Sequence, residues 1–354
     1  MRIGLVLAAG GSVGVAYHGA VLSALQEETG WDPRDAEVMV GTSAGSLTSA
    51  MLRAGVPAGD LARISEGQPL SPEGARLASI GQPHRPRPRR ADLFAIRPMS
   101  DPGAVLQAVT RPWAVSPKAL ALAALPGGGI STDAISSGID AVYAGRWPDR
   151  PLWLCSYNLR EGRRVVFGRP GAPQGTVGQA VAASCAIPMY FRPVEIGGHR
   201  YVDGGVHSMI NLDLVADQDL DLVVAVSPLS QASRFGDLTP ATLMRQPMRA
   251  RLQAEVAALK RSGVPVVAVQ PGRSITSAMG LNPMDAARRQ AVSTATRAGV
   301  RRWLRDGHEG RHLARVLRRA AHEASEPGGR RRVARLDEVS PVDEVASRRR
   351  RGSA

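Results

Sequence analysis

Short runs of consecutive apolar residues alternate along the chain with longer segments of helical periodicity. The runs at 3–8 and 38–40 are each followed by a glycine-rich turn and an amphipathic stretch, which extends to about Glu28 and to about Arg53 respectively. Uniformly apolar runs of this length predict strands buried on both faces, as in parallel sheets. Strand, glycine turn and helix, repeated within the first fifty or so residues, predict a parallel α/β sheet.

Further strands are expected where apolar runs return, at 152–157, 165–167, 191–196, 222–226 and 264–269. Residues 66–130 are rich in Pro and Arg and lack a clear period before 104–124, so we interpret them as an insertion or lid over the sheet. From residue 327 onward, Gly, Arg and acidic residues follow without periodicity, which predicts a disordered, Arg-rich tail. The expected organisation is one α/β domain over 1–326, with the insertion at 66–130 and the tail at 327–354.

Composition excludes several classes of protein. Apolar residues make up 44% of the 354 residues, enough for a sizeable core. The two cysteines, Cys155 and Cys185, exclude a disulfide framework and a cysteine-based metal site. No run approaches the ~18 apolar residues of a membrane span. The first apolar run is too short for a signal peptide, so a cytoplasmic location is expected.

The formal charge of +14 is concentrated in two segments. Residues 301–354 hold 15 Arg against 8 acidic residues, a net +7, and the run at 84–90 adds +4. No zinc finger, clear helix-turn-helix or aromatic-interleaved RNA motif accompanies this charge, so nucleic-acid binding is not expected. The excess predicts either a solvated basic periphery or peripheral contact with an anionic membrane, at its inner face.

Ser43 is the candidate nucleophile. Gly41-Thr42-Ser43-Ala44-Gly45 fits G-x-S-x-G, with a predicted strand before it and a predicted helix after it. Such a turn holds the serine in a strained conformation and places its hydroxyl at a helix N-terminus, where developing negative charge is favoured. The alternative is a glycine-flanked turn in which Ser43 only caps the helix.

The glycine cluster after the first strand could in principle serve a dinucleotide. However, Ala8 stands where the first glycine of G-x-G-x-x-G belongs, and no acidic residue ends the second strand. The exposed backbone N–H groups of Gly10, Gly11 and Ser12 are instead predicted to form an oxyanion hole. A purely structural tight turn is the alternative.

Asp203 is the candidate base. It follows an apolar, strand-like segment and precedes Gly204 and Gly205. A carboxylate held in a tight glycine turn can lie close to a serine hydroxyl and accept its proton directly. Alternatively, Asp203 only organises its own backbone as an Asx-turn.

In this order and spacing, the serine turn, the glycine cluster and the Asp-Gly-Gly block resemble the patatin-like phospholipase family. The similarity covers residues 7–22, 41–46, 180–193 and 201–213. It implies a three-layer α/β/α fold with a mainly parallel sheet and a catalytic dyad in which Ser43 is the nucleophile and Asp203 the base. It also implies hydrolysis of ester bonds in phospholipids, lysophospholipids or acylglycerols during lipid degradation or remodelling, with neither a metal nor an organic cofactor.

The chain departs from the family pattern at two positions. Ala9 stands where the family usually has the first of three glycines, and Val13 stands where it usually has Arg or Lys. If that cation helps to hold an anionic substrate, its absence affects phospholipid preference more than ester hydrolysis.

Two other hypotheses remain open. One is an α/β-hydrolase with a Ser–Asp–His triad, for which the candidate histidines are His207, His308, His312 and His322. Against it, that fold normally places strands before the oxyanion strand, whereas here the oxyanion loop begins at residue 9. The other is a non-catalytic lipid-binding scaffold with the patatin fold.

Overall fold

The computed structural model describes residues 1–80, 98–111, 115–232 and 240–325. Part of the predicted insertion and the predicted tail at 327–354 therefore lie outside the described residues. Within the described residues, eight strands form one sheet. They are β1 Ile3–Leu7, β2 Val38–Thr42, β3 Leu152–Asn158, β4 Arg163–Phe167, β5 Val194–Ile196, β6 His199–Asp203, β7 Leu222–Val226 and β8 Val266–Val269.

The sheet is mainly parallel. Its order is β5-β6-β3-β2-β1-β7-β8, with β4 paired to β3. The strands from β3 through β2, β1 and β7 to β8 run parallel, and β4, β5 and β6 add an antiparallel edge. Strands β1, β2, β3 and β7 are buried along their whole length, as the uniformly apolar runs predict.

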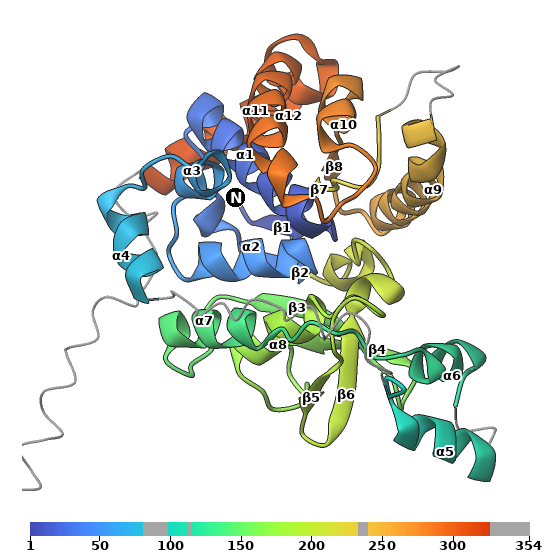
Figure 1. Cartoon of the computed structure of the whole chain (residues 1–354). Coiled ribbons are helices and arrows are strands. Elements are labelled where there is room, and N and C mark those ends of the chain that lie inside the picture. The colour runs from blue at the N-terminus through green and yellow to red at the C-terminus, as the bar shows by residue number, and fades with distance from the viewer. Residues whose placement is uncertain (81–97, 112–114, 233–239, 326–354) are drawn as a thin grey trace, which may run out of the picture.

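Helices cover both faces of this sheet (Figure 1). They are α1 Gly11–Thr29, α2 Ala44–Arg53, α3 Ala58–Glu66, α4 Pro72–Ile80, α5 Pro102–Thr110, α6 Pro117–Ala124, α7 Asp133–Tyr143, α8 Val177–Ser184, α9 Pro240–Arg261, α10 Arg273–Met279, α11 Arg289–Asp306 and α12 His308–Ser325. Alternate residues of β1 face opposite cores: Leu5 and Leu7 join the core with α1, α2, α8 and α11, whereas Val6 packs with α9. The fold is thus the expected α/β/α sandwich.

Two helices of the predicted insertion, α5 and α6, lie at the antiparallel edge of the sheet, beside β4 and β6, whereas α4 lies beside α7 (Figure 1). Leu122 of α6 packs against Tyr157, Leu159 and Val202. Lys118 donates a hydrogen bond to the carbonyl of Val206, in the turn that follows β6. Helix α6 is therefore anchored to the end of β3 and to β6, and α5 packs against α6.

Part of the basic excess is neutralised within the fold. On α11, Arg297 lies 2.8 Å from Glu27 and Arg305 lies 3.0 Å from Glu28, and Arg301 contacts both acids. Both glutamates belong to α1, so these arginines tie α11 to α1. Among the described residues, no helix has the length and apolar character needed to cross a membrane.

Candidate active site

Ser43 occupies a sharp turn between β2 and α2. Its backbone has φ 54° and ψ −119°, a left-handed φ that a residue with a side chain rarely adopts. Such a conformation costs about 1–3 kcal/mol and persists only where the surroundings hold it. Here the Ser43 carbonyl accepts hydrogen bonds from the Ser46 and Leu47 N–H groups, at 2.9 and 3.3 Å, and from the Ser46 hydroxyl at 2.6 Å.

The two glycines of the G-x-S-x-G motif are required by close packing. A Cβ atom on Gly45 would lie 1.9 Å from the carbonyl oxygen of Leu7, and one on Gly41 would lie 2.6 Å from the Cα of Ser46. These contacts press the start of α2 against β1 and β2. A strand–turn–helix junction this tight therefore requires glycine at both positions of the motif.

The sheet topology brings Asp203 to Ser43. Strand β4 occupies one edge of β3, so β2 and β6 share the other edge end to end. The last residue of β2, Thr42, pairs with Cys155, and the last residue of β6, Asp203, pairs with the next residue of β3, Ser156. Because β6 runs antiparallel, the two strand ends meet, and Ser43 and Asp203 lie together at this junction.

The Asp203 carboxylate is buried and hydrogen-bonded. It interacts with the Ser43 hydroxyl, and its Oδ1 accepts the N–H of Gly205 at 2.7 Å. Burial raises the pKa of Asp203 to about 6, although both hydrogen bonds act in the opposite direction. The carboxylate is therefore mostly ionised at neutral pH and is able to accept a proton.

The sequence did not reveal the residues that fix this junction. The Ser184 hydroxyl accepts the N–H of Ser43 at 2.9 Å and donates to the Cys155 carbonyl at 2.7 Å. The N–H of Asp203 donates to the Ala186 carbonyl at 2.9 Å. Ser184 and Ala186 belong to the stretch at 180–193, which only the family resemblance singles out in the sequence.

Neither cysteine is activated as a nucleophile. Burial raises the pKa of both the Cys155 and Cys185 thiols to about 12. Cys185 instead contacts the Ser43 carbonyl, 3.4 Å from its sulfur. Its role in the junction is packing and weak hydrogen bonding.

The glycine loop presents free backbone donors beside the serine turn. The N–H groups of Gly10, Gly11 and Ser12 have no acceptor among the described residues, whereas the next one, on Val13, donates to the Pro283 carbonyl at 3.1 Å. The three free donors stand at the N-terminus of the 19-residue helix α1, where the helix dipole favours an anion. A Cβ atom on Gly14, in the first turn of α1, would lie 3.3 Å from the Ala44 Cβ, which places the start of α1 against that of α2.

The glycines of the loop and of the Asp block are also sterically required. Gly11 has φ 61°, and a Cβ atom on it would lie 2.6 Å from the Pro283 carbonyl oxygen. A Cβ atom on Gly204 would lie 2.3 Å from the Cys155 carbonyl oxygen. One on Gly205 would lie 3.1 Å from Oδ1 of Asp203. Side chains at these positions would displace the backbone around Ser43 and Asp203.

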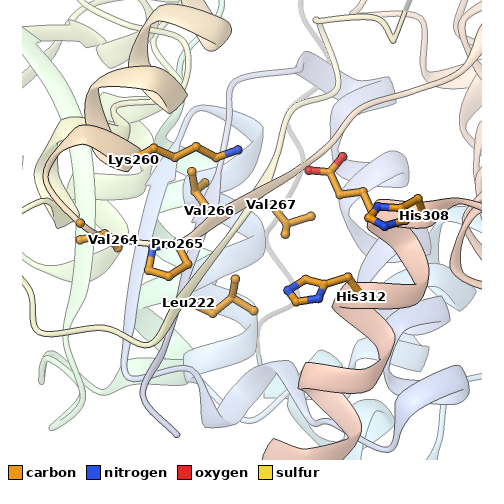
Figure 2. Close-up of a pocket in the computed structure, with 10 residues that line it drawn as sticks. Leu222, Lys260, Val264, Pro265, Val266, Val267, His308 and His312 are labelled. Carbon is orange, nitrogen blue, oxygen red and sulfur yellow. The ribbon is translucent and has the colours of Figure 1, made fainter.

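The candidate histidines of a triad lie elsewhere. His308 and His312 line a cavity of about 630 Å³ beside Leu222 and Val266, which begin β7 and β8 (Figure 2). This is the amino end of the parallel strands, whereas Ser43 follows the carboxyl end of β2. His322 precedes Glu323, which contacts the amino terminus just before β1.

His207 is close to Asp203 in sequence, but most of its neighbouring charged groups are arginine and lysine side chains and its residue surface is exposed. Its pKa is lowered by partial burial and by the nearby Arg164 guanidinium. His18 on α1 is fully buried, and burial lowers its pKa to about 3, so it is neutral. Among the described residues, no cluster of three or more His, Cys, Asp or Glu side chains is placed to hold a metal ion.

Comparison with known proteins identifies the family. The family model of the patatin-like phospholipases matches residues 5–216, which include the glycine loop, the serine turn and the Asp-Gly-Gly block. The chain belongs to this family, and it is a hydrolase that acts on ester bonds of lipids.

Solved structures with low sequence identity also align with most of the chain. VipD from Legionella pneumophila is 16% identical, with a TM-score of 0.42 over 89% of this chain and 67% of that one. The heterodimeric ExoU–SpcU complex from the type III secretion system of Pseudomonas aeruginosa gives 19% identity and a TM-score of 0.29, over 92% and 69%.

Proposed function

We propose that this chain hydrolyses lipid esters through a covalent acyl-serine intermediate at Ser43, with Asp203 as the base and with the N–H groups of Gly10, Gly11 and Ser12 as the oxyanion hole. The observation that carries the proposal is that the sheet topology brings the Ser43 turn and the buried carboxylate of Asp203 to one strand junction, where the Ser43 hydroxyl lowers the pKa of that carboxyl against the effect of burial. No further titratable group is needed between them, because the carboxylate is itself in reach of the proton to be removed.

The reaction balances with these residues alone. As the Ser43 oxygen attacks the ester carbonyl, its proton moves to Asp203 and the negative charge develops on the carbonyl oxygen, facing the free N–H groups of the loop. The bond to the alcohol then breaks, and the alcohol leaves with the proton from Asp203. Water attacks the acyl-serine and gives its proton to Asp203. The acid is released, and the proton returns to the serine oxygen.

The substrate class follows from the family and is tested by hydrolysis. We expect activity towards phospholipids, lysophospholipids or acylglycerols carrying fatty acyl chains, and we propose that the basic periphery contacts anionic membrane surfaces. A screen of these three lipid classes, with a soluble short-chain ester alongside, should give product with the wild-type protein and none above background with Ser43→Ala. Lipid binding without hydrolysis in every class would support the scaffold hypothesis instead.

The pH dependence of kcat/KM separates an aspartate base from a histidine base. Because the base must be ionised, activity should rise with pH along a single acid limb with its midpoint near pH 6, where the buried Asp203 carboxyl loses its proton. His207 is the histidine nearest to Asp203 in sequence and has a lowered pKa, so its removal is the necessary control. His207→Ala should keep both the limb and most of the activity; loss of the limb in this variant would assign the titration to the histidine.

A further inference from the structure

Arg245 of α9 is a buried cation whose hydrogen bonds within the described part of the chain go to uncharged groups. Its residue surface is only 9% exposed, and among the described residues no acidic group pairs with it. The ionisable neighbour that acts on it is the phenol of Tyr17, which is fully buried and neutral because burial raises its pKa. An unpaired buried charge is costly, so its retention calls for a specific role.

The guanidinium is held by two contacts, one with the segment that follows β7 and one with the last residue of α10. Nη1 donates to the carbonyl of Pro228 at 2.7 Å, and Nη2 lies 3.6 Å from the sulfur of Met279. Pro228 is the second residue after β7, and the residue before it, Ser227, donates its N–H to Val269 at 3.0 Å. Proline has no N–H, so its carbonyl is the only backbone group by which Pro228 itself can be tied in place.

Pro228 forms the wall behind the glycine loop. A Cβ atom on Gly10 would lie 2.5 Å from the Cγ of Pro228, and one on Gly14 would lie 3.4 Å from the same atom. The proline ring therefore fills the space that side chains at these two glycines would need. A shift of Pro228 would release the backbone of Gly10 and Gly11, whose N–H groups have no acceptor among the described residues.

We propose that Arg245 is a positioning residue for the oxyanion hole, which it serves by fixing the Pro228 carbonyl and, through the proline ring, the Gly10–Gly11 backbone. This inference rests on the proposed function, because it presupposes that these N–H groups stabilise the oxyanion. No carboxylate of the described residues pairs with Arg245, so its positive charge also adds to the positive potential around the loop as negative charge develops on the substrate.

The test compares Arg245→Met and Arg245→Lys with the matched control Arg273→Met, which removes an exposed arginine at the start of α10. For each variant, active sites are titrated with a fluorophosphonate, and kcat and KM for a soluble ester are expressed per titrated site. Loss of one direct oxyanion donor costs about 10²–10³-fold in kcat, so loss of a positioning residue should cost about 10- to 100-fold. KM should change little, Lys should recover part of the loss, and Arg273→Met should match the wild type.

A merely structural role gives a different result. It would lower the melting temperature and the titratable fraction of Arg245→Met but leave kcat per titrated site within twofold of the wild type, and that outcome would overturn the proposal. If Arg245→Met does not fold, kcat per titrated site is compared with the wild type for Pro228→Ala and Arg245→Lys. An unchanged kcat per site in both variants would equally overturn the proposal. A wild-type protein that does not react with the fluorophosphonate would instead refute the proposed function.

Discussion

Replacement of Ser43 by Ala should lower kcat for a lipid ester by roughly 10³- to 10⁶-fold, because the acyl-enzyme can no longer form. Asp203→Asn should cause a loss of similar order, since the amide keeps the shape of the carboxylate but cannot take the serine proton. The two residues act as a unit, so the double variant should be no slower than the slower single variant. Steady-state kinetics with a soluble short-chain ester measures all three.

The control for this comparison is the fold of each variant. Ser43 is 4% exposed and its backbone is fixed by Ser46 and Ser184, so the far-ultraviolet circular dichroism of Ser43→Ala should match the wild type. Losses that multiply in the double variant would show that the two residues act independently. That outcome would contradict a dyad.

Asp203→Asn should make the folded protein more stable at pH 8 while it removes activity. Burial raises the pKa of Asp203 from 3.8 to about 6, so folding favours the protonated carboxyl. This contribution to stability is complete below pH 3.8 and is lost as the pH rises through 6. At pH 8 the ionised Asp203 therefore lowers the free energy of unfolding of the wild type by at most about 3 kcal/mol. Asp203→Asn removes this loss.

Urea denaturation at pH 8 and at pH 4 measures this difference. The stability gain of Asp203→Asn should be present at pH 8 and should disappear at pH 4. Asp213 is the matched control, because its ion pair with Arg164, at 2.6 Å, lowers its pKa. Asp213→Asn should therefore lose stability at pH 8, the opposite sign. If Asp203→Asn instead destabilised the protein at pH 8, the folded state would stabilise the ionised carboxylate. That result would contradict a raised pKa of Asp203.

The serine turn and the parallel core were open to prediction because their signals are local. A uniformly apolar run followed by G-x-S-x-G predicts both the strand and the turn. In the structure, each glycine of the motif is required by a neighbouring backbone atom, such as the Leu7 carbonyl oxygen next to Gly45. The family match over residues 5–216 agrees with the resemblance read from these motifs.

The pairing of Ser43 with Asp203 could not be derived from local pattern. It depends on β4 filling one edge of β3, so that β6 must meet β2 on the other edge. The sequence places the two residues 160 positions apart and contains no sign of that edge assignment. Only the resemblance to a family connected them.

Two other features lay beyond the sequence for different reasons. Arg245 is one of many arginines on amphipathic segments, and only tertiary packing shows that it is buried with no carboxylate partner in the part of the chain that the structure describes. Helices α5 and α6 lie in the segment interpreted as an insertion or lid, but the sequence does not show which surface of the sheet they cover. The observed contacts of α6 are with the ends of β3 and β6.

The most direct test of the central claim is covalent labelling of the wild-type protein with a fluorophosphonate, followed by mass spectrometry of the intact chain and its peptides. The account predicts one adduct per chain, on the peptide that contains Ser43, with loss of lipid-ester hydrolysis in proportion to labelling. Ser43→Ala should remain unlabelled. An active protein that loses its activity by labelling at another residue, or a Ser43→Ala variant that hydrolyses lipid esters at the wild-type rate, would contradict the account.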